Sequence, residues 1–278
     1  MIDSKIIDAD IQRFLAEDVG NGDLTALVIA EEKLAKATII TREDTLVCGQ
    51  AWVDAVFKKL DAGISINWQL KEGEQAFAGD VLCHLSGSAR GLLTGERVAL
   101  NILQTLSATA SLANQYAKAV EGTNATVLDT RKTIPGLRLA QKYAVHCGGA
   151  SNHRTGLYDG ILIKENHIMA AGSIAQAITS ARKASATVPV EVEVENMDEV
   201  AQALEAKADI LLIDNFTLKQ LEQAVAFNKG VAKLEASGNV TLSTIRDIAE
   251  TGVDFISIGA LTKNVQAVDL SMRVSLEA

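Results

Sequence analysis

The stretch VEVEVE, residues 190–195, decides which fold the sequence predicts. Side chains alternate along a strand, so Glu191, Glu193 and Glu195 share one face and the valines share the other. A parallel strand in an open sheet is buried on both faces and would not tolerate a row of carboxylates. A barrel can direct that row into its lumen, toward a cation or metal at the mouth. The stretch therefore favours an α/β barrel.

Similar apolar runs continue on both sides of this stretch. After Gly122 they alternate with helical patterns, and six runs stand out: ATVLD, YDGILIK, VPVEVEVE, ADILLID, VAKLEAS and VDFISIG. Repeated strand and helix units predict parallel strands covered by helices. Lys233, Glu235 and Ser237 repeat the polar row in the fifth run, which supports the barrel a second time. The predicted barrel domain covers residues 108–264.

The remaining segments predict a smaller mixed α/β domain, built from residues 1–107 and 265–278. Apolar residues at helical spacing predict a first helix that stops before Gly20, and short strand patterns with glycine turns follow. Thr94 can cap a long helix that links the two domains. The alternation in VDLSMRVSLEA predicts a half-buried strand that joins the N-terminal sheet.

The composition excludes several classes of protein. Hydrophobic residues make up 48% of the 278 residues, enough for a buried core, while a net charge of −9 and 4% aromatics disfavour a nucleic-acid-binding protein. The three cysteines have no CxxC spacing and predict reduced thiols. Neither a signal peptide nor a membrane span is indicated, so we expect a cytoplasmic protein that binds no membrane.

Polar residues and glycines stand at all six predicted strand ends, where an α/β barrel gathers its functional groups. In chain order these ends are Asp129 to Lys132, Lys164 to Asn166, Glu193 to Asn196, Asp214-Asn215, Ser237 to Asn239 and Gly259-Ala260. The stretch from Asp129 to Ile168 also predicts a basic pocket in an acidic protein, because it concentrates the cations Arg131, Lys132, Arg138, Lys142, Arg154 and Lys164. These ends are therefore the predicted site.

The residue types at this site restrict the ligand. Charge-assisted bonds to carboxylate and phosphate oxygens can come from Arg131, Lys132, Arg154 and Lys164. Glu193 and Asp214 are placed to hold Mg²⁺ with water. The Ser237-Gly238-Asn239 and Gly259-Ala260 loops match those that bind a terminal phosphate through backbone N–H groups. The residues predict a phosphorylated, polyanionic small substrate with Mg²⁺.

Two side chains allow more than one interpretation. His153 lies beside Arg154 among polar residues, and contact with an anion and an ordinary loop position are both open for it. Arg97 falls in the first turn of the predicted linking helix, where the helix dipole does not stabilise a cation. A solvated and a functional side chain are both open for Arg97.

Several motifs together resemble the quinolinate phosphoribosyltransferases, also called nicotinate-nucleotide pyrophosphorylases (carboxylating). They are DTRKTIPGLRLAQKYAVHCGGASNHRTGLYDGILIKENH, EDVGNGDLT, GERVALNILQTLS, EVEVEN, LLIDN and LEASGN. The resemblance covers essentially the whole chain. It implies transfer of phosphoribosyl from phosphoribosyl pyrophosphate to quinolinate with Mg²⁺, releasing pyrophosphate and CO₂ and giving nicotinate mononucleotide for NAD synthesis.

The resemblance also implies an architecture. The family combines an N-terminal α/β domain, which recruits the C-terminal strand, with an open, incomplete α/β barrel. Its members work as homodimers or multiples of dimers, in which the N-terminal side of one subunit closes the barrel mouth of the other. Arg97 matches the arginine that enters the neighbouring subunit's site.

The same resemblance implies roles for matching residues. The quinolinate carboxylates lie near Arg131, His153, Arg154 and Lys164, and the pyrophosphate lies toward Lys132 and Lys164. The 5′-phosphate cradle matches Ser237, Gly238, Asn239 and Gly259. Thr130 and Ala260, at the same strand ends, complete the predicted binding set. Glu193 and Asp214 match the acidic pair near Mg²⁺ and the ribose, and with Lys164 they are the predicted catalytic residues.

Three other functions stay open. A phosphoribosyltransferase for nicotinate that does not decarboxylate, and a relative from molybdenum-uptake gene clusters, are the alternatives among enzymes. A catalytically silent anion-binding protein is the alternative from another class. A receptor for two carboxylates favours quinolinate, and the acidic strand ends argue against the silent protein.

Overall fold

The alternation in VEVEVE is realised in strand β8 (Val190–Val194) of the computed structural model, which describes residues 2–276. The valine face is fully buried, whereas Glu193 on the other face lines a pocket. Strand β8 belongs to a six-stranded parallel sheet with the order β6-β11-β10-β9-β8-β7. The other strands are β6 (Thr126–Leu128), β7 (Ile161–Ile163), β9 (Ile210–Asp214), β10 (Lys233–Ser237) and β11 (Phe255–Ser257).

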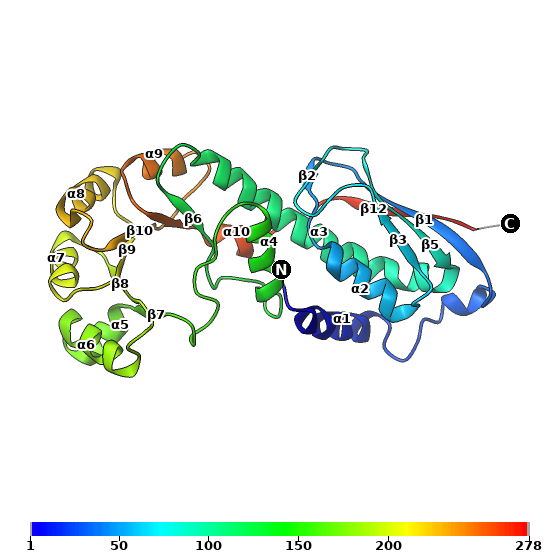
Figure 1. Cartoon of the computed structure of the whole chain (residues 1–278), viewed down its shortest axis with the longest axis horizontal. Helices are drawn as coiled ribbons and strands as arrows, with labels where there is room; N and C mark the ends of the chain where they lie inside the picture. The colour runs from blue at the N-terminus through cyan, green and yellow to red at the C-terminus, as the bar shows by residue number, and fades with distance from the viewer. Residues whose placement is uncertain (1, 277–278) are drawn as a thin grey trace. The chain divides into compact units, whose positions relative to one another are not determined.

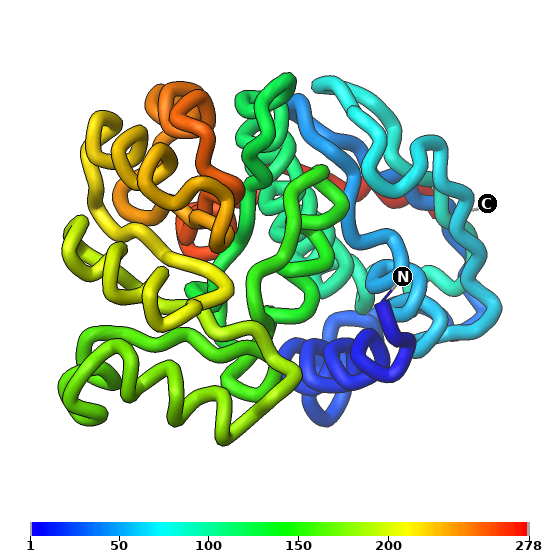
Figure 2. The backbone as a smooth tube through the Cα atoms, turned by 60° about the vertical axis from the view of Figure 1, so that its left-hand side comes forward, coloured from blue at the N-terminus to red at the C-terminus, as the bar shows by residue number. Residues whose placement is uncertain are grey.

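This strand order produces an open barrel. Strands β6 and β7 are consecutive along the chain but lie at opposite edges of the sheet. Within residues 2–276 no ladder joins them. Helices follow one another around the outside of the sheet (Figures 1 and 2): α5 (Glu165–Ala171), α6 (Ile174–Ala184), α7 (Met197–Glu205), α8 (Leu218–Asn228) and α9 (Ile245–Glu250), with the short α10 (Ala260–Lys263) after β11. The predicted fold class is confirmed.

A second sheet carries the N-terminal residues. It is antiparallel with the order β12-β1-β5-β3, formed by β1 (Leu34–Thr41), β3 (Ser65–Trp68), β5 (Val81–Ser88) and β12 (Leu270–Leu276). A separate two-stranded ladder joins β2 (Thr45–Leu46) to β4 (Gln75–Ala76). Because β12 pairs with β1 along its length, the C-terminal strand does join the N-terminal sheet, as its alternation predicts.

Helices complete this part of the chain. They are α1 (Ser4–Asp18), the single 3₁₀ turn η1 (Ala26–Val28), α2 (Gln50–Leu60) and the long α3 (Ala89–Ala119). Trp52 and Phe57 of α2 are fully buried and are among the largest side chains of the core. Within the described residues, no helix is both long enough and apolar enough to cross a bilayer.

Two predicted helix starts are wrong. Helix α3 (Ala89–Ala119) begins five residues before Thr94, because the apolar spacing already starts at Ala89 and Leu92, which are fully buried. Arg97 therefore lies well inside the helix, away from the positive end of its dipole. Helix α9 (Ile245–Glu250) begins later than LSTIRDIAE predicts, since residues 241–244 form a turn closed by hydrogen bonds.

The long connection between β6 and β7 contains a helix that the sequence analysis did not predict. Helix α4 (Arg138–Cys147) buries Ala140, Ala144 and Val145 on one face. The chain divides into two compact units, and residues 139–148 group with 2–112 and 264–276, although they lie inside the predicted barrel range. The second unit consists of residues 113–138 and 149–263, and the pocket described below lies entirely within it.

Candidate active site

A pocket of about 430 Å³ opens among the carboxyl ends of the barrel strands. Its lining includes nine of the residues predicted for the site: Thr130, Arg131, Lys132, His153, Arg154, Lys164, Glu193, Asp214 and Ser237. Leu162, Leu212, Glu235 and Ser257 complete it. Gly238, Asn239, Gly259 and Ala260 follow lining strands but do not line the pocket themselves, and Arg97 belongs to the other unit.

The strand register explains why these residues meet. Ser237 is the partner of Asp214 across the ladder between β10 and β9, so both strand ends stop at the same level. Glu193 is the partner of Leu212 in the ladder between β8 and β9. Parallel strands bring their carboxyl ends to one edge, and side chains two residues apart share a face. The three polar strand ends therefore form one continuous wall.

Lys164 and Glu193 form an ion pair across this wall. The Glu193 side chain is 11% exposed and that of Lys164 is 47% exposed, so the pair stands where the pocket meets solvent. His167 does not face the pocket, because its Nδ1 accepts the backbone N–H of Lys164 at 3.0 Å and fixes the start of α5. An anion that enters the pocket would compete with Glu193 for the ammonium of Lys164.

Arg131 and Arg154, the arginine pair, place two cationic side chains in the lining of the pocket. Burial, and then the charge of Arg131, lower the pKa of Arg154. Arg154 Nη1 donates to the Gly160 carbonyl at 3.0 Å, while the buried Nε of Arg131 has no hydrogen-bond partner among residues 2–276. A buried cationic donor without an acceptor is costly, so an anionic ligand that accepts from it would bind favourably.

Arg138 holds the arginine pair in place but does not itself line the pocket. Its guanidinium donates to the Arg131 carbonyl and to the Thr155 carbonyl, each at 3.2 Å, and to Thr133 Oγ1 at 3.1 Å. The segments that carry Arg131 and Arg154 are thereby tied to one another. Arg138 is one of the cations of the predicted basic pocket, but it does not line the pocket and instead supports the two segments.

His153 is fixed by contacts on every side. Its backbone N–H donates to buried Asp129 at 2.9 Å, and its Nδ1 accepts the N–H of Arg154 at 2.7 Å. Nε2 lies 3.0 Å from Glu191 Oε2 and 3.5 Å from Glu235 Oε2. Since Nδ1 accepts the N–H of Arg154, the ring carries a proton on Nε2, which points toward the two carboxylates. A direct contact between this ring and an anion would require the ring to turn.

Glu191 and Glu235 are the site residues that the sequence analysis did not select. They are 4% and 1% exposed. Burial first, and then the charge of Glu191, raise the pKa of Glu235 to about 7, although His153 opposes the shift. The alternation of β8 and β10 already directed both side chains to the lumen face, and this was the available signal. What the pattern did not show is that they meet around His153.

The loop after β10 depends on a glycine. Gly238 has a φ of +107°, and a Cβ there would collide with the side-chain oxygen of Asn215. Asn215 is itself held by its N–H to the Ser237 carbonyl at 2.9 Å and by its amide to Asp214 at 2.6 Å. The backbone of this loop can therefore come close to a ligand, as a phosphate cradle requires.

The ends of β6 and β11 are also joined. A Cβ on Gly259 would lie 3.0 Å from Lys132 Cδ, and Thr262 Oγ1 donates to the Lys132 carbonyl at 2.8 Å. These contacts place Lys132 beside the last of the strand-end loops. Cations therefore approach the pocket from β6 and β7, and glycine loops from β10 and β11.

The donors in the pocket fit Mg²⁺. Glu193 and Asp214 offer carboxylate oxygens, and oxygens of Glu165, Glu193 and Glu195 lie within 4.8 Å of one another. Mg²⁺ prefers oxygen donors and keeps several waters while it binds substrate phosphates. An open wall with one or two carboxylates suits that ion better than a closed cage would.

Comparison with known proteins identifies relatives along the whole chain. The family description "Quinolinate phosphoribosyl transferase, N-terminal domain" matches residues 23–107, and "Quinolinate phosphoribosyl transferase, C-terminal domain" matches residues 109–273. A probable nicotinate-nucleotide pyrophosphorylase [carboxylating] of Bacillus subtilis is 39% identical over 267 residues, which cover 96% of this chain and 92% of the relative.

Solved structures extend the similarity to the fold. The nicotinate-nucleotide pyrophosphorylase from Francisella tularensis superposes with a TM-score of 0.95 at 46% identity, covering 99% of this chain and 98% of that one. NadC from Streptococcus pyogenes superposes with a TM-score of 0.96 at 37% identity, covering 100% and 99% of the two chains. The fold of the whole chain is therefore shared with these proteins.

Proposed function

The chain belongs to the quinolinate phosphoribosyl transferase family, and we propose that it transfers phosphoribosyl from phosphoribosyl pyrophosphate to quinolinate with decarboxylation. The products are nicotinate mononucleotide, CO₂ and pyrophosphate, in the de novo synthesis of NAD. The observation that carries the proposal is that one pocket is lined both by the cationic Arg131 and Arg154 and by the acidic Glu193 and Asp214. Cationic side chains can bind the two carboxylates of quinolinate, and acidic side chains can stabilise a positive charge on the ribose.

In this proposal, Arg131 and Arg154 bind quinolinate. The unpartnered Nε–H of Arg131 and the guanidinium of Arg154 donate hydrogen bonds to the two ring carboxylates, and Arg138 ties the two segments together. Positioning of the ring nitrogen opposite C1 of the ribose is the largest contribution that such a receptor can make. The nitrogen then attacks C1, and the bond from C1 to pyrophosphate breaks with its electron pair on the departing oxygen.

The two acidic residues of the pocket stabilise the positive charge that develops on the ribose. Glu193 and Asp214 face the substrate as carboxylates, and Lys132 and Lys164 face the charge that builds on pyrophosphate. We assign Mg²⁺ to Glu193 and Asp214, where it would neutralise pyrophosphate oxygens when bound. The loops at Gly238 and Gly259 would receive the 5′-phosphate, with Ser237, Asn239 and Ala260 beside them.

Decarboxylation follows from the ribosylated ring. The positive ring nitrogen holds the electron pair left on C2 when the adjacent carboxylate departs as CO₂, and C2 then takes a proton. Of the two donors considered from the sequence, Lys164 is the better placed. Its ammonium reaches the pocket, whereas the Nε2 proton of His153 points toward Glu191 and Glu235.

We further propose that the protein works as a homodimer, or a multiple of dimers, in which Arg97 reaches the partner's pocket. Arg97 lies inside α3 and is absent from the pocket of its own chain. Support for the shared site comes from the family resemblance and from this separation. A cytoplasmic location and the lack of a nucleic-acid partner stay predictions.

The activity is tested with purified protein, quinolinate, phosphoribosyl pyrophosphate and Mg²⁺. We expect nicotinate mononucleotide and CO₂ in equal amounts, and no product when nicotinate replaces quinolinate. Product from nicotinate alone would instead identify a phosphoribosyltransferase without decarboxylation. Binding of phosphoribosyl pyrophosphate without turnover of either pyridine would identify a silent anion-binding protein.

A further inference from the structure

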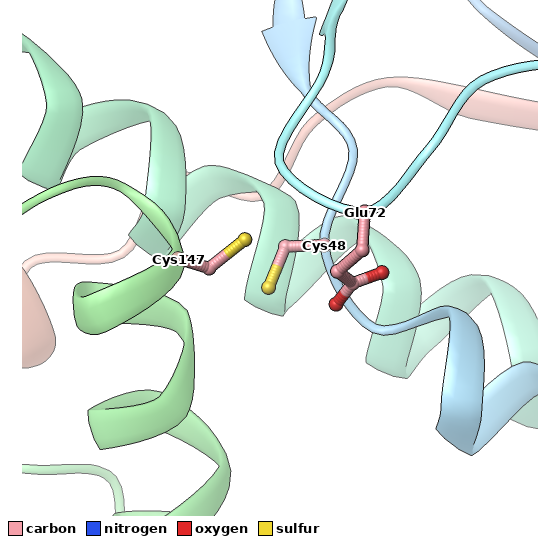
Figure 3. Close-up of side chains that lie close together, drawn as sticks. All are labelled: Cys48, Glu72 and Cys147. Carbon is pink, nitrogen blue, oxygen red and sulfur yellow. The ribbon is translucent and has the colours of Figure 1, made fainter. Parts of the chain in front are cut away.

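Two cysteines far apart in the chain meet in the first unit. Cys48 precedes α2 and Cys147 is the last residue of α4. Figure 3 shows their side chains pointing toward one another, with Glu72 beside them. The two sulfur atoms and one carboxylate oxygen of Glu72 all lie within 4.8 Å of one another. Two thiols that are far apart in the sequence therefore lie side by side, with the carboxylate of Glu72 next to them.

Glu72 already has a structural task. Its two carboxylate oxygens accept the backbone N–H groups of Gly49 at 2.8 Å and Gln50 at 3.1 Å, at the start of α2. Such bonds satisfy donors that a helix start leaves free. A structural zinc site needs four ligands, and this cluster offers two thiols and one engaged carboxylate. Chemistry between the two sulfur atoms fits the cluster better than zinc does.

Hydrogen bonds hold the backbone of Cys48, whereas glycines surround Cys147. The N–H of Cys48 donates to Ser107 Oγ at 3.0 Å, and Ser107 Oγ donates back to the Cys48 carbonyl at 3.2 Å. A Cβ on Gly73 would lie 3.3 Å from the Cys147 sulfur, so that sulfur packs against a bare Cα. Gly148 and Gly149 follow Cys147, and glycines allow small movements of a helix end.

The two thiols differ in reactivity. Cys147 is half-buried, and a hydrogen bond from the Cys48 thiol lowers its pKa, against the opposing effects of burial and of Glu72. The bond to Cys147 and burial raise the pKa of Cys48 well above its usual value. Because the thiolate is the nucleophile and Cys147 is the less buried of the two, Cys147 would attack an oxidant and Cys48 would resolve the product. Burial raises the pKa of the third cysteine, Cys83, to about 12.

We propose that Cys147 and Cys48 form a disulfide when the protein meets a hydroperoxide. The Cys147 thiolate attacks one peroxide oxygen, the O–O bond breaks, and hydroxide leaves, which gives a sulfenic acid on Cys147. The Cys48 sulfur then attacks the Cys147 sulfur, and the hydroxyl group leaves as water with the Cys48 proton. Two thiols are oxidised, and one hydrogen peroxide is reduced to two waters.

The test treats full-length protein with hydrogen peroxide in slight excess and follows intact mass and free thiols. We expect a species about 2 Da lighter, the mass of two hydrogens. Peptide mapping should join Cys48 to Cys147 and leave Cys83 as a free thiol. The matched variants are Cys48→Ser, Cys147→Ser and Cys83→Ser. With Cys48→Ser a sulfenic acid should persist on Cys147 and be trapped by dimedone.

The other variants make the outcome decisive. Cys83→Ser should form the disulfide as the wild type does, and Cys147→Ser should form neither disulfide nor sulfenic acid. An unchanged mass, a bridge that includes Cys83, or trapping on Cys48 in place of Cys147 would overturn the proposal. Stoichiometric zinc in native mass spectra of the untreated protein would also overturn it, in favour of a metal site.

Discussion

Oε2 of Glu235 lies 3.5 Å from Nε2 of His153, and the same nitrogen lies 3.0 Å from Glu191. Two carboxylates thus face one imidazole at a position where Glu235 is only 1% exposed. Burial and the charge of Glu191 raise the pKa of Glu235 to about 7, so the carboxyl group titrates near neutral pH. The cluster therefore makes stability depend on pH.

The first prediction concerns this dependence. Glu235 keeps its proton in the folded state at pH values where the unfolded chain has lost it, so its stabilising contribution is complete below about pH 4.5 and is lost as pH rises through about 7. At about 1.36 kcal/mol per pKa unit, the loss amounts to at most roughly 3 kcal/mol. Urea unfolding between pH 5 and 8 should show a smaller decline for Glu235→Gln than for the wild type.

Glu222→Gln is the matched control for this measurement. Glu222 is exposed on α8, so its substitution should leave the slope of stability against pH unchanged. Equal slopes for the wild type and Glu235→Gln would show that Glu235 is ionised throughout the range, contrary to the raised pKa.

The second prediction concerns Lys164. Its ammonium faces pyrophosphate in the proposed reaction and is paired with Glu193 in the free protein. Lys164→Met should lower kcat/KM about 100-fold or more, because a charge that acts on the transition state is lost. Lys219→Met, on the exposed side of α8, should keep full activity. A Lys164→Met enzyme with unchanged kcat would remove Lys164 from the mechanism.

The alternation of VEVEVE was enough to predict a barrel with an acidic lumen, because a period of two is a property of one strand alone. That the barrel is open was implied only by the family resemblance. The contact between Glu235 and His153 was not predictable in this way. It depends on the register of β8, β9 and β10 and on the segment from Ser151 to His153, which hydrogen-bonds beside the end of β6. Side chains that meet through several strands leave no local pattern.

The missed helix α4 has a different cause. Ala140, Ala144 and Val145 follow helical spacing, but the surrounding cations and histidines drew the whole stretch into the predicted site. Lys142, counted there as a site cation, is 4% exposed in the first unit. Charge placed Arg131 and Arg154 in the predicted site, and both line the pocket, yet charge did not separate residues of the pocket from residues of the scaffold.

The third prediction separates the two substrates. Arg131→Ala should raise KM for quinolinate about 10- to 100-fold, because a charge-assisted hydrogen bond contributes roughly 1.5–3 kcal/mol. KM for phosphoribosyl pyrophosphate should change much less. Initial rates at varied concentrations of each substrate measure the difference. Equal increases in the two KM values would place Arg131 at the pyrophosphate and contradict the proposed receptor.

The fourth prediction tests the loop after β10. Gly238→Ala introduces a Cβ at a φ of +107° that meets Asn215, so it should cost about 1–3 kcal/mol of stability and raise KM for phosphoribosyl pyrophosphate. Gly122→Ala is the control, because Gly122 also has a positive φ, +80°, but an added Cβ would meet nothing within 4 Å. It should lose stability through backbone strain while its KM stays that of the wild type.

The last prediction tests the shared site. Arg97→Ala and Lys164→Ala should each be inactive alone, because each damages every site of a homodimer. After mixing and subunit exchange, a hybrid has one site that combines Arg97 of one subunit with Lys164 of the other. Activity should therefore return to about a quarter of the wild-type level for random pairing with equal amounts of each variant. If native mass spectra show hybrids but no activity returns, Arg97 does not act across the interface.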